Sequence, residues 1–208
     1  MTHKKLGNEN CNPKSELFCF NTETKSPEQS AAKHYKTHVA IIECTHFILR
    51  RHAFAETARI IFNKCRIILE AQAGFVALLD KSRRDMDILH LEQGGLPGPA
   101  CYDSPFPARG LRLEALKNRR PVLCNNFRES KWAKLLPEGH ASLHNVLLSP
   151  MVIENISVGL LGFANKPTDF DHDDMLIALS FAKLAALSLS GSKAWHLLQG
   201  KTGRDKIT

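Results

Sequence analysis

Two histidines four residues apart, His140 and His144, are the side chains best spaced for coordination chemistry. On a helical turn they would share one face, as the ligands of a metal ion or a haem iron do. Cys124, at the end of a preceding apolar segment, would add a thiolate. No carboxylate is spaced to complete a zinc site, and Gly139 disfavours a helix here. We therefore favour pocket-lining or surface positions for these three side chains over a metal site.

Thiol chemistry is the second candidate. The chain has 6 cysteines and no Cys-x-x-Cys pair, which favours reduced thiols over a disulfide framework or a structural zinc site. Cys44 and Cys65 fall in helical patterns and are expected in the core. Cys101 and Cys124 lie where loops and strands meet, and a thiol at a strand end near Arg or His can be acidified. Cys124 is therefore a candidate redox sensor.

Other catalytic motifs are missing from the sequence. No Gly-x-x-x-x-Gly-Lys-Ser/Thr phosphate loop occurs. Gly94–Gly98 follows a strand pattern but leads into prolines, so it is not a dinucleotide-binding fingerprint. A run of aspartates lacks the Gly and Glu of a calcium loop and suits a helix cap better: Asp169, Asp171, Asp173 and Asp174. The sequence predicts no enzymatic activity.

Composition limits the class of protein. The 208 residues are 43% hydrophobic and 24% charged, as in a globular domain with tails. No apolar run approaches the roughly 18 to 20 residues of a membrane span, and the N-terminus lacks a secretory signal, so we expect a cytoplasmic protein without a membrane partner. The net charge of +7 (28 − 21) comes from short separate clusters without interleaved aromatic residues. Solvated turns explain these clusters better than a nucleic-acid interface does.

Hydropathy patterns divide the chain into four parts. Residues 1–30 are predicted to form a mobile polar leader, 31–52 an N-terminal dimerisation helix, 53–199 a single domain and 200–208 a basic tail. The helical patterns over roughly 33–70 and 171–199 carry apolar stripes wider than one sheet face would bury. They predict a homodimer through the terminal helices.

Strand patterns between these helices set the fold class. Five apolar segments have the pattern of strands: 74–80, 87–92, 121–126, 145–153 and 157–164. A parallel sheet would need a helix between successive strands, and the sequence has too few helical patterns between these segments. The sequence therefore predicts an α+β fold with a mainly antiparallel sheet of five to six strands. Long N- and C-terminal helices would cover one face, while loops and short helices would roof a pocket on the other.

Several motifs in these elements resemble those of a known family. They are Pro150–Ile153 with Val158–Gly162, then Asn165-Lys166 followed by Phe170 and Asp174, and finally Arg109-Gly110-Leu111 with Trp132, Leu136–His140 and Asn145–Leu147. Over about residues 53–190 they resemble the GAF domain family, a GAF/PAS-like fold, and are similar to GAF modules of bacterial and archaeal sensor histidine kinases. Met175 stands where the Asn-Lys…Phe…Asp-Glu signature has Glu.

The resemblance implies a sensory or regulatory module that binds a small molecule or cofactor and signals through a dimer or a signalling protein partner. Three alternatives stay open: a haem-binding redox or gas sensor, a ligand-free dimerising scaffold, and a free methionine-(R)-sulfoxide reductase. The reductase motifs carry cysteines in the segments that correspond to 108–111 and to 140–145, and this chain has none in either. The resemblance also implies that Lys166 pairs with Asp174, so that Asn165, Lys166, Phe170 and Asp174 act structurally.

The predicted pocket combines a cation, imidazoles, amides and aromatic rings. We expect a flat, partly anionic ligand such as a nucleotide, a tetrapyrrole or an aromatic acid. Its candidate binding residues are Arg109, Leu111, Cys124, Asn126, Phe127, Trp132, His140, His144, Asn145 and Leu148.

Overall fold

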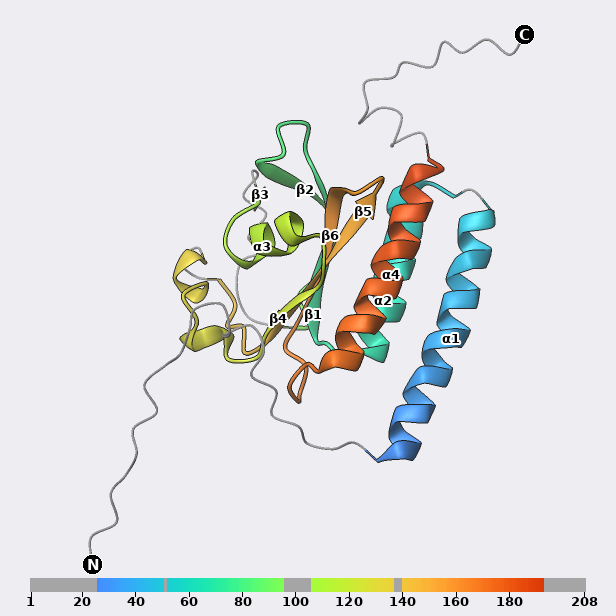
Figure 1. Ribbon diagram of the computed structural model, residues 1–208, viewed down its shortest axis with the longest axis horizontal. Coiled ribbons are helices and arrows are strands. Elements are labelled where there is room, and N and C mark those ends of the chain that lie inside the picture. Colours follow the sequence, from blue (N-terminus) through green and yellow to red (C-terminus); the bar gives the residue numbers. More distant parts are fainter. Residues whose placement is uncertain (1–25, 51, 96–105, 137–139, 193–208) are drawn as a thin grey trace, which may run out of the picture.

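The computed structural model describes residues 26–50, 52–95, 106–136 and 140–192 (Figure 1). Most of the predicted leader 1–30, the basic tail 200–208 and Cys101 lie outside the described residues. The elements in chain order are the helices α1 (Pro27–Leu49) and α2 (Phe54–Ile68), strands β1 (Ala73–Leu79), β2 (Asp85–Glu92) and β3 (Phe106–Pro107), helix α3 (Leu111–Asn118), strand β4 (Val122–Cys124), the 3-10 turns η2 (Phe127–Glu129) and η3 (Ala133–Leu135), strands β5 (Val146–Ile153) and β6 (Ile156–Ala164), and helix α4 (His172–Ser190).

The six strands form one sheet in the order β3-β2-β1-β6-β5-β4, and every neighbouring pair is antiparallel. This confirms the predicted α+β fold. The β5–β6 hairpin turns at Glu154 and Asn155, which both have positive φ (48° and 64°). Two successive left-handed residues match the right-handed twist of the flanking strands.

The helices cover one face of the sheet in two layers (Figure 1). α2 and α4 pack directly on the strands, and α1 lies outside them against both helices. The core between α2, α4 and the sheet contains the fully buried rings of Phe62, Phe163 and Phe181, of which the first two stack at 5.5 Å. None of the described helices combines the length and apolar composition of a membrane-spanning segment.

The predicted N-terminal helix differs from the structure at its start. α1 begins at Pro27, within the predicted leader 1–30, because Ser26 and Gln29 form a capping box. Its inner side buries Thr37, Ala40 and Cys44. The helical pattern of 33–70 is divided into two helices, so the stripe that includes Ile42 and Leu49 faces solvent.

A buried carboxylate joins three elements. Lys166 Nζ, just after β6, lies 2.5 Å from Asp174 Oδ2 in the first turn of α4, and both side chains are almost fully buried. Lys33 of α1 pairs with the other oxygen of Asp174. Asp171 caps α4 by accepting the Asp174 amide, and its own amide donates to Asp174 Oδ2. The ion pair implied by the resemblance is therefore present, and α1 is bound to it as well.

Two basic clusters that are separate in sequence meet at one end of the sheet. Arg83, in the β1–β2 turn, donates to the carbonyl of Ser157, and Arg119, after α3, donates to the carbonyl of Asn155. Both guanidiniums are exposed and are held by neutral carbonyls. The β5–β6 hairpin therefore holds one arginine from each of two basic turns at the same end of the sheet.

Removing the shared carboxylate should strongly destabilise the fold. In Asp174→Ala, the buried ammonium of Lys166 would lose the carboxylate that it contacts, and breaking a buried pair in this way costs about 3–5 kcal/mol. Urea unfolding followed by circular dichroism would measure the loss. Asp173→Ala is the matched control, because the Asp173 side chain is 42% exposed and lies 3.9 Å from His34, so its loss should cost under about 1 kcal/mol. A wild-type midpoint for Asp174→Ala would contradict the structural role.

Candidate ligand cavity

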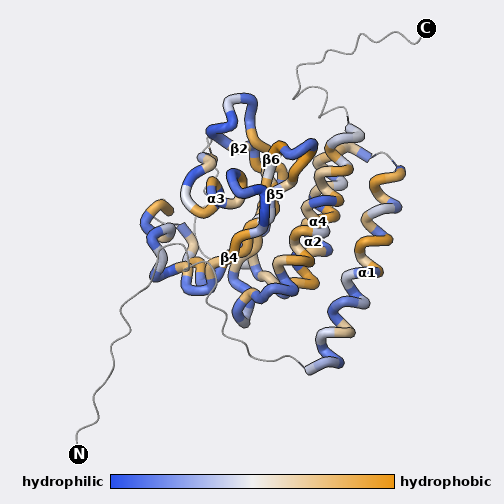
Figure 2. The backbone as a smooth tube through the Cα atoms, viewed as in Figure 1, coloured by the Kyte–Doolittle hydropathy of each residue, from blue (hydrophilic) through white to orange (hydrophobic). Residues whose placement is uncertain are grey.

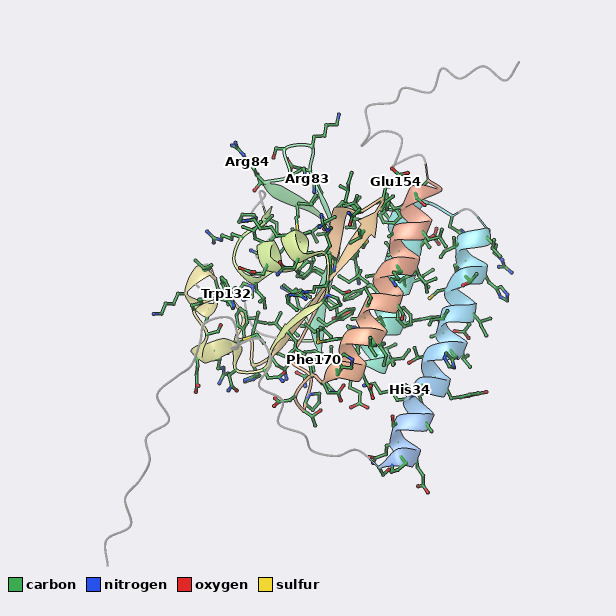
Figure 3. All side chains as sticks on the ribbon, viewed as in Figure 1. His34, Arg83, Arg84, Trp132, Glu154 and Phe170 are labelled. Atoms are coloured by element: carbon green, nitrogen blue, oxygen red, sulfur yellow. The ribbon has the colours of Figure 1, made fainter. Side chains whose placement is uncertain are left out.

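A cavity of about 150 Å³ lies on the face of the sheet opposite α2 and α4. Strands β1, β2 and β6 form its floor, while α3, the η2–η3 segment and residues 140–143 surround it. Figure 3 shows Trp132 on this side, far from Phe170, which lies at the base of α4. A volume of this order holds a molecule about the size of one aromatic ring. The lining side chains are mostly apolar and include Phe75, Ile88, Leu91, Phe106, Leu111, Phe127, Trp132, Leu135, Leu136, Leu143, Val146 and Leu148.

The walls depend on close packing of aromatic rings. Phe75 and Phe106 meet edge to face at 5.2 Å. Gly162 of β6 makes room for Phe75, since an added Cβ would lie 2.4 Å from the Phe75 ring. Gly110 precedes α3 with φ of 61°, and a Cβ there would lie 2.9 Å from Leu135. These glycines set the width of the cavity.

Six of the ten residues predicted to bind a ligand line this cavity: Arg109, Leu111, Phe127, Trp132, His140 and Leu148. The other four, Cys124, Asn126, His144 and Asn145, are not among its lining residues. Asn126 and His144 are exposed. Whether any of the six contacts a ligand stays a prediction.

Asn145 has a structural position instead of a pocket position. Its side-chain amide donates to the carbonyls of Lys166 and Thr168 at 3.0 and 2.9 Å, and its oxygen accepts the Lys166 amide at 2.9 Å. Asn165, which adopts φ of 57°, accepts the His144 amide and donates to the Ser142 carbonyl. Asn125 holds both backbone groups of Phe170 in the same manner. The side-chain amides of these three asparagines thus hold the backbone between the end of β6 and the start of α4 in one conformation.

The histidines and Cys124 do not form a metal site. Residues 140–144 are not helical, so His140 and His144 do not share a helix face. Among the described residues, no three His, Cys, Asp or Glu side chains are grouped to hold a metal ion. His140 Nδ1 lies 2.7 Å from the Ala141 carbonyl. The cavity is also below the ~300–1,000 Å³ of most drug-sized sites, so its residues do not fit a haem macrocycle.

The described thiols are protected from deprotonation. Burial raises the pKa of Cys124, despite a hydrogen bond with Ser130 that acts in the opposite direction. Burial also raises the pKa of Cys44 to about 11 and that of Cys65 well above its ordinary value. The expected acidification of Cys124 is therefore wrong, because desolvation outweighs its polar neighbours.

The polar lining residues that the sequence analysis missed are Glu92, Gln93 and Arg112, and Arg112 has the most unusual surroundings. Its guanidinium carbon lies 4.0 Å from the centre of the Phe106 ring, and its Nε is buried without a hydrogen-bond partner. Burial, and then the nearby charge of Arg109, lower its pKa to about 10. One signal in the sequence could have indicated it: Arg112 is a cation in the first turn of α3, where the helix dipole disfavours positive charge.

The comparisons with known proteins agree with this architecture. The family model described as "GAF domain" matches residues 52–190, more than half of the chain. The chain therefore belongs to the GAF domain family, whose members are commonly sensory or regulatory modules of signalling proteins. The comparison with curated proteins gives no match.

Solved structures show the same fold at low sequence identity. The GAF domain of a phosphoenolpyruvate-protein phosphotransferase from Coxiella burnetii has a TM-score of 0.65 and 13% identity over 80% of this chain and 97% of that one. A domain of a putative two-component sensor histidine kinase from Sinorhizobium meliloti has a TM-score of 0.57 and 15% identity, over 71% of this chain and 98% of that one. Free methionine-R-sulfoxide reductase from Neisseria meningitidis has a TM-score of 0.62 and 12% identity, over 82% of this chain and 95% of that one.

Alkylation kinetics should show that the thiol of Cys124 reacts slowly in the folded protein. Because only the thiolate reacts and burial raises the pKa, iodoacetamide should modify Cys124 at pH 7 more slowly in the folded protein than in urea. The rate should continue to rise at pH values above the ordinary thiol pKa. Peptide mapping by mass spectrometry assigns the site, and Cys124→Ser is the control. Faster modification in the folded state would restore the redox-sensor hypothesis.

Proposed function

We propose that this chain is a cytoplasmic sensory module that binds a small molecule in the cavity and transmits binding through a dimer or a signalling protein partner. The observation that supports this most directly is the cavity itself. It is apolar, about the size of one aromatic ring and bordered by a few polar groups, including Glu92, Arg112 and His140. A concave apolar site with a few polar side chains is the usual form of a ligand site.

The proposal includes no catalytic turnover. Cys124 is the described cysteine nearest to this face of the sheet, yet it does not line the cavity and its pKa is raised. The likeness to the Neisseria reductase is one of fold at 12% identity and carries no activity to this chain.

The proposed dimer uses the outer side of α1. Tyr35, Val39, Ile42, His46 and Leu49 are all exposed and follow one another in steps of four and three. That spacing is the seam of a coiled coil. Figure 2 shows that apolar residues continue along the C-terminal half of α1, outside the apolar helix α4. A second copy of the same helix would cover this seam by two-fold pairing.

Filling the cavity should abolish ligand binding. Val146→Phe would place a ring where Val146 now borders the cavity, and Leu143→Phe would enlarge a second lining side chain. We expect melting temperatures that rise with concentration for at least one class of small molecule with the wild type, and no rise with these variants. Ile156→Phe, at an exposed site in the β5–β6 hairpin, is the control.

Denaturing mass spectrometry and an absorption spectrum of the purified protein complete this test. If no small molecule co-purifies and neither charged nor neutral compounds shift the wild-type melting temperature, the binding proposal fails. The ligand-free scaffold is then the better description.

Charging the α1 seam should give a monomer. Ile42 is 58% and Leu49 is 72% exposed, so Ile42→Glu and Leu49→Glu should not disturb the core. Multi-angle light scattering should give twice the chain mass of 23.3 kDa for the wild type and the single mass for these variants. Ile156→Glu should remain dimeric, since Ile156 lies in the β5–β6 hairpin. A monomeric wild type at high micromolar concentration would refute the dimer.

A further inference from the structure

We propose that the ligand of the cavity is a small organic acid whose carboxylate pairs with Arg112 and whose apolar body fills the space between the sheet and Trp132. This inference rests on the proposed function and specifies the chemical class of the ligand. It begins from a charge that the protein brings into an apolar site and does not neutralise.

The environment of Arg112 is that of a receptor for an anion. Its guanidinium stacks on Phe106 at 4.0 Å, and burial leaves Nε without a partner. Among the described residues, no carboxylate lies within ion-pair distance of Arg112. A half-buried cation without a counter-ion costs stability, and a bound anion would recover it.

The other charged and titratable lining groups do not replace that anion. Glu92 Oε1 accepts the Gly94 amide at 3.0 Å, within its own loop. Arg109 is exposed at the rim and donates to the Leu135 carbonyl at 2.8 Å. His140 is held at Nδ1 beside the Ala141 carbonyl. Among the described lining residues, two arginines and one carboxylate give a net positive charge.

The size and lining of the cavity select the rest of the ligand. Most of its wall is apolar, so a bare inorganic anion would leave that wall unfilled. At about 150 Å³ it is too small for a nucleotide and suits one ring or a short chain. A planar carboxylate matches the paired N–H donors of a guanidinium, which a lysine could not offer. A monocarboxylic acid with a compact apolar body satisfies all three conditions.

Matched acids and amides test this inference. Isothermal titration would compare benzoate with benzamide and hexanoate with hexanamide, on the wild type, Arg112→Gln, Arg112→Lys and the control Arg84→Gln in the β1–β2 turn. We expect at least one acid to bind the wild type at least tenfold more tightly than its amide. Arg112→Gln should remove that preference, Arg112→Lys should restore it in part, and Arg84→Gln should keep it.

A second measurement needs no ligand. Because the unpaired cation destabilises the free protein, Arg112→Gln should melt at a higher temperature than the wild type when both are free of ligand, and the difference should narrow as the acid is added.

Each contrary result has a defined meaning. If an amide binds as tightly as its acid, or if Arg112→Gln keeps the preference for the acid, the inference is wrong while the sensory proposal stands. If inorganic phosphate binds as tightly as the acid, the inference that an apolar body fills the cavity is wrong. If neither acids, amides nor phosphate bind, the inference is wrong, and the melting-temperature screen and mass spectrum described above then decide the proposed function.

Discussion

The fold depends on surrounding one buried carboxylate, Asp174, with donors from three elements. A buried charge is tolerated only when other groups surround it with donors. Here Lys166 comes from the end of β6, Lys33 from α1 and the amide of Asp171 from the start of α4. The need to bring these donors to one point fixes where β6 ends, where α4 begins and how α1 lies on the other helices. The amide side chains of Asn145 and Asn165 secure the intervening chain.

Arg112 presents the opposite case on the other face of the same sheet. Asp174 is neutralised by the protein's own groups and therefore stabilises the fold. Arg112 is stacked and half-buried, but no carboxylate among the described residues approaches it. A partly buried charge without a counter-ion lowers the stability of the fold, and natural proteins usually accept such a cost at functional sites. This difference is the physical reason to assign a stabilising role to the charges on the helical face of the sheet and a ligand-binding role to the charge on the cavity face.

Much of this arrangement could be predicted from local sequence patterns. The hairpin of β5 and β6 follows from two continuous apolar runs around a polar turn, and the start of α4 follows from the cap chemistry of Asp171. The side on which α1 is buried could not be predicted, because the helix carries two apolar stripes and only the position of α2 and α4 decides between them. His144 and Asn145 were assigned to the pocket because the segment 140–145 has no periodicity to show which side chains point inward. Arg112 was missed because its surroundings come from distant elements, above all Phe106.

The position of α1 also separates two definitions of a domain. The family model begins at residue 52, yet the continuous core already includes Ala40 and Cys44, and Lys33 contacts the central carboxylate. A fragment excised at the family boundary would therefore lose one of the two lysines that neutralise Asp174 and would uncover apolar surface on α2 and α4. The unit that folds therefore includes α1 and is longer than the unit that the family model defines.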